Sequence, residues 1–349
     1  MLYRALRNLG MTLLAICASG TAWAAEPEGA FYKGKQIRLI VSSNAGTGYD
    51  AYARVLAQFM PKYIPGNPTI VVQNMGGASG LTGAGYVYNV APRDGTVFAS
   101  AVSNLPTTPL LSPEAAPFDV GKLGWIGSMS TDPYVGFVWH SAPIRTFEEA
   151  KTKEVLMGGT ASVGSASVEM TRLSNQLFGT KFRLITGYKD TVETKLAIER
   201  GEVQGTFANA WGSLKVAEAD WLRENKIRII IQHGFHPHPE LPDVPLLVDQ
   251  AKTEADHQAL ELMLGRQEYS KPFFTPPGVP ADLLEILRRA FDLAIKDPGL
   301  QAAMQKAKLD LVGPLTGAEL EVMVKRAAGT PDSVVQRVKS IISSPEDTK

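Results

Sequence analysis

Short β-branched runs alternate along the chain with segments whose apolar residues recur every three or four positions. Residues 36–42 (QIRLIVS) predict a buried strand, and residues 50–63 predict a helix, because their apolar residues share one helical face. That face consists of Tyr52, Val55, Leu56, Phe59, Met60 and Tyr63. The alternation is typical of parallel α/β units.

The same pattern predicts further elements on both sides of residue 123. A helix over 190–200 is marked at both ends, by the capping pair Asp190 and Glu193 and by Gly201. Pro280 and the capping pair Thr316 and Glu319 each predict the start of another helix. The other predicted elements are strands 69–73, 96–102, 134–139, 155–157, 182–186, 203–208 and 227–232, and helices 167–178 and 334–342.

The first 25 residues predict a cleaved signal peptide. Arg4 and Arg7 precede the apolar run 11–18, and small residues two apart, Ala22 and Ala24, follow it. The alternative is a buried N-terminal helix. The single cysteine, Cys17, lies inside this leader, so the mature chain has no thiol, which fits the oxidising periplasm.

Composition narrows the classes of partner. Removal of the leader leaves roughly 325 residues, enough for two domains. The whole chain has 35 basic and 35 acidic residues, and this balance argues against nucleic acid and anionic membrane as partners. Beyond the leader, no apolar stretch approaches the length that spans a membrane.

A glycine-containing loop between the first strand and the first helix is the strongest candidate site. Backbone N–H groups at a helix start are unsatisfied and favour an anion, and Gly46 and Gly48 let a ligand approach the backbone. Purely structural glycines remain an alternative. A dinucleotide site is another, although Asn74 stands where that fingerprint has an acid. The candidate contacts are Ser43, Asn44, Ala45, Gly46, Thr47, Gly48, Tyr49 and Asp50.

Other small polar loops follow later strands and are expected to face the same crevice, because ligands bind at the carboxyl ends of parallel strands. Among them, Lys189 is either a charged contact or a solvated loop lysine. Trp211 is either a core or a cleft-wall aromatic residue. These loops contribute as candidate contacts Gly76, Gly77, Ala78, Ser103, Asn104, Thr160, Ser162, Gly164, Ser165, Tyr188, Lys189, Asp190, Asn209 and Trp211.

Signals of catalysis are weak. The chain has no G-x-S-x-G, Walker or H-E-x-x-H motif. His233, His236 and His238 have a spacing that a metal could use, but the interleaved Pro237 and Pro239 favour histidines of a linker. We therefore expect no metal, no cofactor and no enzymatic activity.

The chain resembles the tripartite tricarboxylate transporter substrate-binding proteins, also called Bug receptors, over nearly the whole mature sequence. The matching motifs occur in the order of that family. They are K-Q-I-R-L-I-V at 35–41, Asp50, Ala53-Arg54, V-V-Q-N-M-G-G-A at 71–78, A-P-R-D-G at 91–95, G-Y-K at 187–189, G-E-V at 201–203, L-P-D-V-P at 241–245 and P-P-G-V-P at 276–280.

The resemblance implies a type II-like periplasmic binding protein with two Rossmann-like α/β lobes and a ligand cleft between them. In the family, backbone amides of the first loop, here 43–50, hold a carboxylate, helped by 76–80. Second-lobe loops, here 160–165 and 188–190, hold the other end of the ligand. We expect residues 1–25 to be the signal peptide, 26–124 and 235–330 lobe 1, 125–234 lobe 2, and 331–349 a C-terminal helix and tail.

This chain departs from the family in its loops. The family usually has a proline and a Gly-Gly pair in the first loop and a proline where Gly76 stands, and Tyr49 is bulky for its position.

Taken with the resemblance, the sequence predicts a periplasmic receptor for a small organic anion, a di- or tricarboxylate or an aromatic carboxylate. The lobes would close by hinges near 123–126 and 232–240 and deliver the ligand to a membrane permease. Alternatives are a ligand-reporting partner of a sensor kinase and, less favoured, an exported enzyme.

Overall fold

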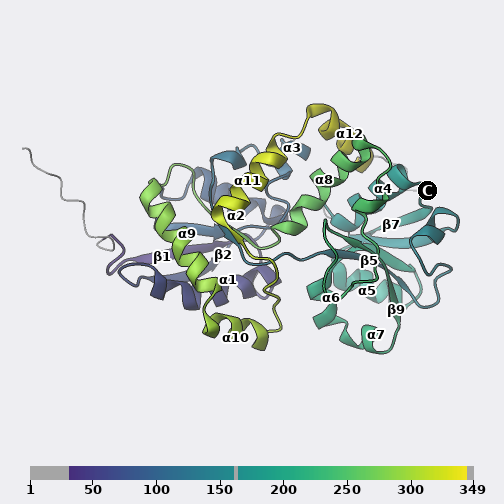
Figure 1. Cartoon of the computed structure of the whole chain (residues 1–349), viewed down its shortest axis with the longest axis horizontal. Helices are drawn as coiled ribbons and strands as arrows, with labels where there is room; N and C mark the ends of the chain where they lie inside the picture. Colours follow the sequence, from purple (N-terminus) through teal and green to yellow (C-terminus); the bar gives the residue numbers. More distant parts are fainter. Residues whose placement is uncertain (1–30, 161–163, 344–349) are drawn as a thin grey trace, which may run out of the picture.

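The computed structural model describes residues 31–160 and 164–343. The predicted leader and Ser162 lie outside the described residues. The described chain forms two lobes, each built on its own mixed sheet with helices around it, and Figure 1 shows them side by side along the long axis.

The sheet of lobe 1 contains six strands within the described residues, in the order β11-β4-β10-β3-β1-β2. β1 pairs in parallel with β2 and β3, as expected for βαβ units, whereas β10 is antiparallel to both β3 and β4. The strands are β1 Gln36–Val41, β2 Thr69–Asn74, β3 Val97–Ser100, β4 Gly124–Ser128, β10 Pro272–Thr275 and β11 Leu315–Thr316.

The sheet of lobe 2 contains five strands within the described residues, in the order β7-β6-β8-β5-β9. β6 is parallel to β7 and β8, but β5 is antiparallel to β8 and β9. The parallel pattern that the sequence predicts thus covers only part of each sheet. The strands are β5 Tyr134–Trp139, β6 Val155–Thr160, β7 Phe182–Tyr188, β8 Gly205–Ala210 and β9 Ile227–His233.

Helices surround both sheets, and the predicted helix over 50–63 is divided in two. Its second part is the 3-10 turn Met60–Tyr63, which contains Pro61, a residue without the N–H that an α-helix needs. The α-helices are α1 Gly48–Phe59, α2 Leu81–Asn89, α3 Thr108–Leu111, α4 Ala166–Phe178, α5 Thr191–Glu199, α6 Trp211–Ala217, α7 Ala219–Arg223, α8 Glu254–Glu268, α9 Ala281–Ile295, α10 Pro298–Lys306, α11 Gly317–Ala328 and α12 Asp332–Ile342.

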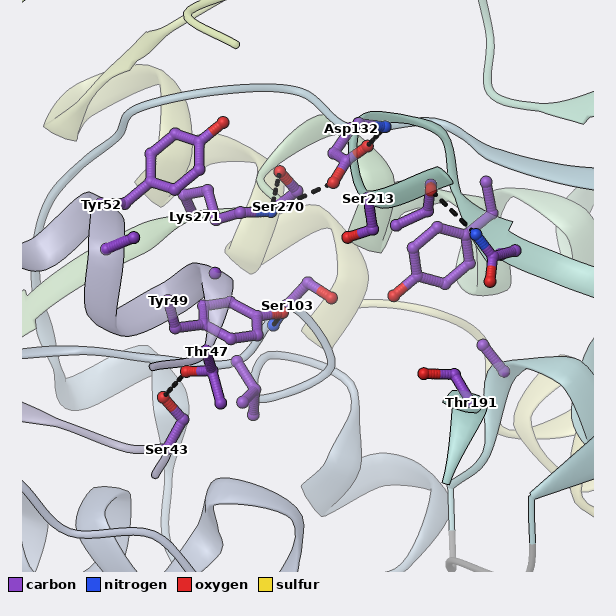
Figure 2. A pocket seen from close by; sticks show the side chains of 18 of the residues that line it. Ser43, Thr47, Tyr49, Tyr52, Ser103, Asp132, Thr191, Ser213, Ser270 and Lys271 are labelled. Carbon is purple, nitrogen blue, oxygen red and sulfur yellow. Dashed lines mark hydrogen bonds and ion pairs between the residues drawn. The ribbon is translucent and has the colours of Figure 1, made fainter. Parts of the chain in front are cut away.

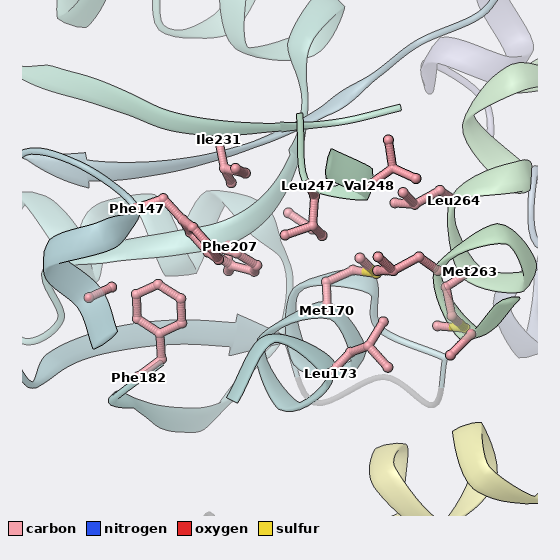
Figure 3. Packing of buried hydrophobic residues seen from close by; sticks show 14 of the residues in the cluster. Phe147, Met170, Leu173, Phe182, Phe207, Ile231, Leu247, Val248, Met263 and Leu264 are labelled. Atoms are coloured by element: carbon pink, nitrogen blue, oxygen red, sulfur yellow. The ribbon is translucent and has the colours of Figure 1, made fainter. Parts of the chain in front are cut away.

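Separate apolar clusters stabilise the two lobes. Successive side chains of β1 point to opposite faces of its sheet, so Leu39 enters one cluster of lobe 1 and Ile40 the other. In lobe 2, Phe207 of β8 lies in a cluster that also holds Met170 of α4 and Met263 of α8 (Figure 3). Helix α12 contributes Val335, Val338 and Ile341 to the same cluster.

The strand pairing divides the chain at different points from the predicted boundaries. β4 pairs with β10 and β11 in lobe 1, so the first crossing is the segment 129–133, whereas the sequence assigned residues from 125 onward to lobe 2. Helix α8 packs on the lobe 2 cluster, although the sequence placed residues 235–330 in lobe 1. The chain returns to lobe 1 only after α8, at 269–271, immediately before β10.

Candidate functional site

A cavity of about 960 Å³ lies between the two lobes. Residues that follow β1, β3, β6 and β8 line it, together with α1, α6 and the segments 129–133 and 266–271. This position, at the carboxyl ends of parallel strands, agrees with the expectation for an α/β sheet. Polar side chains from both lobes face one another across it (Figure 2).

The buried carboxylate of Asp50 fixes the conformation of the loop after β1. It accepts hydrogen bonds from the Gly46 amide (2.8 Å), from Arg54 Nε (3.0 Å) and from Asn74 Nδ2 (2.9 Å). Burial opposes ionisation of Asp50, but these hydrogen bonds outweigh it and hold its pKa below the ordinary value. The Gly46 amide, expected to meet a ligand, is therefore already engaged, and Asp50 lies outside the cavity lining.

We predict that Asp50→Asn weakens ligand binding by tenfold or more without unfolding the protein. The carboxylate accepts on both oxygens, from Gly46 and Arg54 on one and from Asn74 on the other. An amide in either orientation turns its NH₂ toward one of these donors, which displaces the loop. Affinity measured by calorimetry tests this. Asp119→Asn, the same change at an exposed turn, is the control, and equal affinities of the two variants would refute the prediction.

Tyr49 connects two loops of lobe 1 within the cavity wall. Its Oη accepts a hydrogen bond from the amide of Ser103 (3.1 Å), so the loop after β1 is joined to the loop after β3. Nearby, the hydroxyls of Ser43 and Thr47 lie 2.7 Å apart. The large residue at position 49 thus fills space between the loops and shapes the pocket.

Three ion pairs bring basic groups to the cavity wall. Lys271 Nζ lies 3.3 Å from Asp132 Oδ2, Arg266 Nη2 lies 2.8 Å from Glu169 Oε2, and Lys195 Nζ lies 2.9 Å from Glu218 Oε1. The lining also contains Lys308 and Asp310, but neither Glu169 nor Glu218. The charged residues of the lining are therefore four basic ones, Lys195, Arg266, Lys271 and Lys308, and two acidic ones, Asp132 and Asp310. Carboxylates offset three of these four basic residues, so the cavity offers an anion cationic hydrogen-bond donors rather than a large net positive charge.

Comparison with known proteins identifies the family. Residues 52–343 match the family described as tripartite tricarboxylate transporter family receptor. The chain belongs to this family. It is also 25% identical over 300 residues, which are 83% of this chain and 80% of the relative, to the UPF0065 protein in the TAR-I ttuE-ttuC' intergenic region of Agrobacterium vitis.

Two solved structures have a similar fold. A TctC solute binding protein from Polaromonas, without ligand, has a TM-score of 0.67 at 20% identity over 89% of this chain and 99% of its own. MatC from Rhodopseudomonas palustris with bound malate has a TM-score of 0.61 at 18% identity over 89% of this chain and 99% of its own. Two-lobed receptors of this type are periplasmic, and a transporter receptor family gives no support to the sensor-kinase alternative.

Most of the predicted contacts of this TctC-type receptor line the cavity, although their role toward a ligand stays a prediction. Gly46 has φ +81°, a left-handed conformation that glycine adopts without strain. The predicted residues in the lining are Ser43, Asn44, Gly46, Thr47, Gly48, Tyr49, Gly77, Ser103, Asn104, Thr160, Gly164, Ser165 and Asn209.

The structure places other predicted residues of the receptor outside the lining. Trp211 packs in the core of lobe 2, and its Nε1 donates to Glu240 (2.7 Å). Asp190 caps α5 by accepting from the Glu193 amide (2.9 Å). Gly76 lies against Asn44, whose Oδ1 would clash with a Cβ at position 76. The predicted residues outside the lining are Ala45, Asp50, Gly76, Ala78, Tyr188, Lys189, Asp190 and Trp211.

Sequence reasoning missed much of the cavity wall of the receptor. Asp132 precedes strand β5 and so lies at its amino end, where the rule for carboxyl ends gives no signal; it reaches the cavity because β5 runs antiparallel to β8. Lys271 precedes a strand that was not predicted, and no motif surrounds it. The cavity residues missed are Ser42, Ala51, Tyr52, Val102, Asp132, Tyr134, Ala166, Ser167, Thr191, Lys195, Ala208, Ala210, Gly212, Ser213, Val216, Ala217, Arg266, Ser270, Lys271, Ala307, Lys308, Leu309 and Asp310, whereas Gly80, also in the lining, belongs to the loop 76–80 that the resemblance implied.

The sequence favoured a linker for all three clustered histidines, but the structure places two of them in buried positions. His233 is the last residue of β9 and is fully buried, with its ring 5.1 Å from that of Phe207, and His238 is also buried. Among residues 31–160 and 164–343, no group of three or more His, Cys, Asp or Glu has an arrangement that could hold a metal ion. No helix in these same ranges is long and apolar enough to cross a membrane.

Proposed function

We propose that this receptor binds a small organic anion with at least one carboxylate in the cavity between its lobes and delivers it to a membrane permease. The observation that carries the proposal is the gathering of cationic and hydroxyl hydrogen-bond donors from both lobes around one cavity, in a chain that belongs to a tricarboxylate transporter receptor family. Cationic donors hydrogen-bond to a carboxylate more strongly than neutral donors do, and Lys195, Arg266 and Lys271 present such donors at the cavity wall.

The other lining residues suit a carboxylate ligand. Hydroxyls of Ser43, Thr47, Ser103, Thr191 and Ser213 can donate hydrogen bonds to its oxygens. Tyr49, Tyr52 and Tyr134 can pack against a carbon skeleton or an aromatic ring. The similar fold of MatC, whose structure contains malate, supports a ligand of this class. Di- and tricarboxylates and aromatic carboxylates remain the proposed range.

Closure of the lobes would accompany binding. The segments 129–133 and 269–271 join the two sheets, and both contribute residues to the cavity wall, so we place the hinges there rather than near 123–126 and 232–240. Residues 1–25 would direct export to the periplasm, where the receptor meets its ligand. Residues 134–268 and α12 would form lobe 2, and the remaining described residues lobe 1.

A thermal-shift screen against organic acids tests this function. A cognate acid at ~100 times its dissociation constant should stabilise the fold by about 2.7 kcal/mol, because it binds the folded state alone. The screen should include neutral sugars and amines of similar size. A melting temperature raised by these compounds and by no acid would refute the proposed function.

A further inference from the structure

Lys271 brings a largely buried ammonium group to the cavity wall. Its relative exposure is 8%, and it directly precedes β10, where the chain returns to lobe 1. Nζ lies 3.3 Å from Asp132 Oδ2 and 3.2 Å from Ser270 Oγ. The rings of Tyr49 and Tyr52 stand with their centroids each 5.2 Å from Nζ (Figure 2).

These contacts leave part of the ammonium group available to a ligand. An ammonium has three N–H donors, and the described residues give Lys271 two acceptors, Asp132 and Ser270. Two aromatic faces partly compensate the burial of its charge but accept no conventional hydrogen bond. A negatively charged oxygen of a ligand in the cavity can therefore take the third donor.

Asp132 contacts Lys271 through only one of its two carboxylate oxygens. The contact is a single 3.3 Å approach through Oδ2, while Oδ1 accepts from the amide of Gly212 at the start of α6 (3.2 Å). The carboxylate is thus shared between a group next to lobe 1 and a group in lobe 2. Because Lys271 is shielded from water, a charge-assisted hydrogen bond to it has more effect on affinity than one at the surface.

Lys271 also lies apart from Ser43 and Thr47, two hydroxyl residues of the loop expected to hold the first carboxylate. Figure 2 shows the ring of Tyr49 between Thr47 and Ser43 on one side and Lys271 with Ser270 on the other. A ligand with one acidic group at residues 43–48 would thus reach Lys271 only with a different part of its skeleton.

We propose that Lys271 is a specificity-determining residue that selects ligands with a second acidic group. The inference rests on the proposed function, since it names the class of organic acid that the same cavity prefers. A diacid places one carboxylate at the first loop and the other at Lys271. A monoacid leaves Lys271 with a neutral group and loses this charge-assisted hydrogen bond.

Matched pairs of ligands test the inference. The purified receptor is titrated by calorimetry with the unbranched diacids from succinate to suberate, with malate, and with the monomethyl ester of each. The wild type should bind its preferred diacid about tenfold or more tightly than the half-ester. Lys271→Met should bring the two affinities within about twofold by weakening the diacid alone. Lys271→Arg should retain a preference for the diacid.

Two further variants serve as controls. Like Lys271, Lys62 pairs with a buried aspartate, Asp297, and its Nζ lies 5.0 Å from the centroid of a tyrosine ring, but it stands outside the cavity. Lys62→Met should therefore leave the preference for the diacid unchanged. If Lys271→Met unfolds because Asp132 is left without its partner, the double variant Lys271→Met/Asp132→Asn removes both charges and is tested in its place.

Several results would overturn the inference. They are a diacid preference that survives in Lys271→Met, an equal loss of diacid and half-ester in that variant, and a wild type that does not distinguish the two. An ω-amino acid of the same length as the diacid is also titrated. If the wild type prefers it to the diacid, the site beside Asp132 binds a cationic group of the ligand and the inference is wrong. If no acid binds, the proposed function itself fails, and the inference fails with it.

Discussion

Replacement of Arg266 with methionine should lower the free energy of unfolding by about 3–5 kcal/mol. Arg266 on α8 is 4% exposed, and its Nη2 lies 2.8 Å from Glu169 Oε2 on α4. The substitution leaves the buried carboxylate of Glu169 without a cationic partner, and water reaches it poorly. Urea unfolding monitored by tryptophan fluorescence measures the change.

The double variant Arg266→Met/Glu169→Leu separates the effect of an unpaired charge from that of lost packing. It should recover most of the stability, because two apolar side chains can replace a buried ion pair at little cost. Arg223→Met breaks a pair with Asp220 in which both side chains are mostly exposed, and it should cost less than about 1 kcal/mol. Equal losses in Arg266→Met and Arg223→Met would contradict the prediction.

Helix α8, which carries Arg266, is an element that the sequence did not predict. Helix α8 has buried residues on several sides, including the polar Asp256 and Gln267, so it lacks the single apolar stripe from which helices are predicted. Its place on lobe 2 depends on contacts with α4 that are distant in sequence. The apolar pattern therefore gave no sign of α8, and the predicted boundary of lobe 1 included it.

Elements with local signals were predicted well. Strand β5 has the predicted bounds, since its six residues are apolar or aromatic apart from one glycine and a proline precedes them. The capping box of Thr316 and Glu319 is present at the start of α11, because its hydrogen bonds join residues three apart. Such features depend on neighbours in the sequence and not on the rest of the fold.

The cavity shows the same distinction between local and tertiary information. Loops after β1, β3, β6 and β8 could be predicted from the position of strand ends. The direction of each side chain could not, as Asp50 shows by turning inward to Gly46 and Asn74. Lys271 and Asp132 come together only through the fold, since 139 positions separate them. The tertiary fold thus supplies most of the charge of the site.

His233 should make the folded protein sensitive to mild acid. Burial, together with the smaller effect of the positive charge of Arg266, lowers the pKa of its imidazole from the ordinary 6.5 to about 3. Between these values the unfolded chain binds a proton that the folded chain does not. The contribution of neutral His233 to stability is therefore complete above pH 6.5 and is lost as pH falls, by about 3 kcal/mol at pH 4.

His233→Leu should remove this sensitivity and stabilise the protein at neutral pH. Within the described part of the chain, neither ring nitrogen of His233 has a hydrogen-bond partner, so an apolar side chain of similar size relieves a desolvation cost of about 1–3 kcal/mol. Urea unfolding from pH 4 to pH 7 gives the difference between variant and wild type at each pH, which cancels the titration of other groups. His236→Leu, at an exposed position, is the control. A difference that does not grow as pH falls would show that His233 takes up its proton in the folded state as readily as in the unfolded chain.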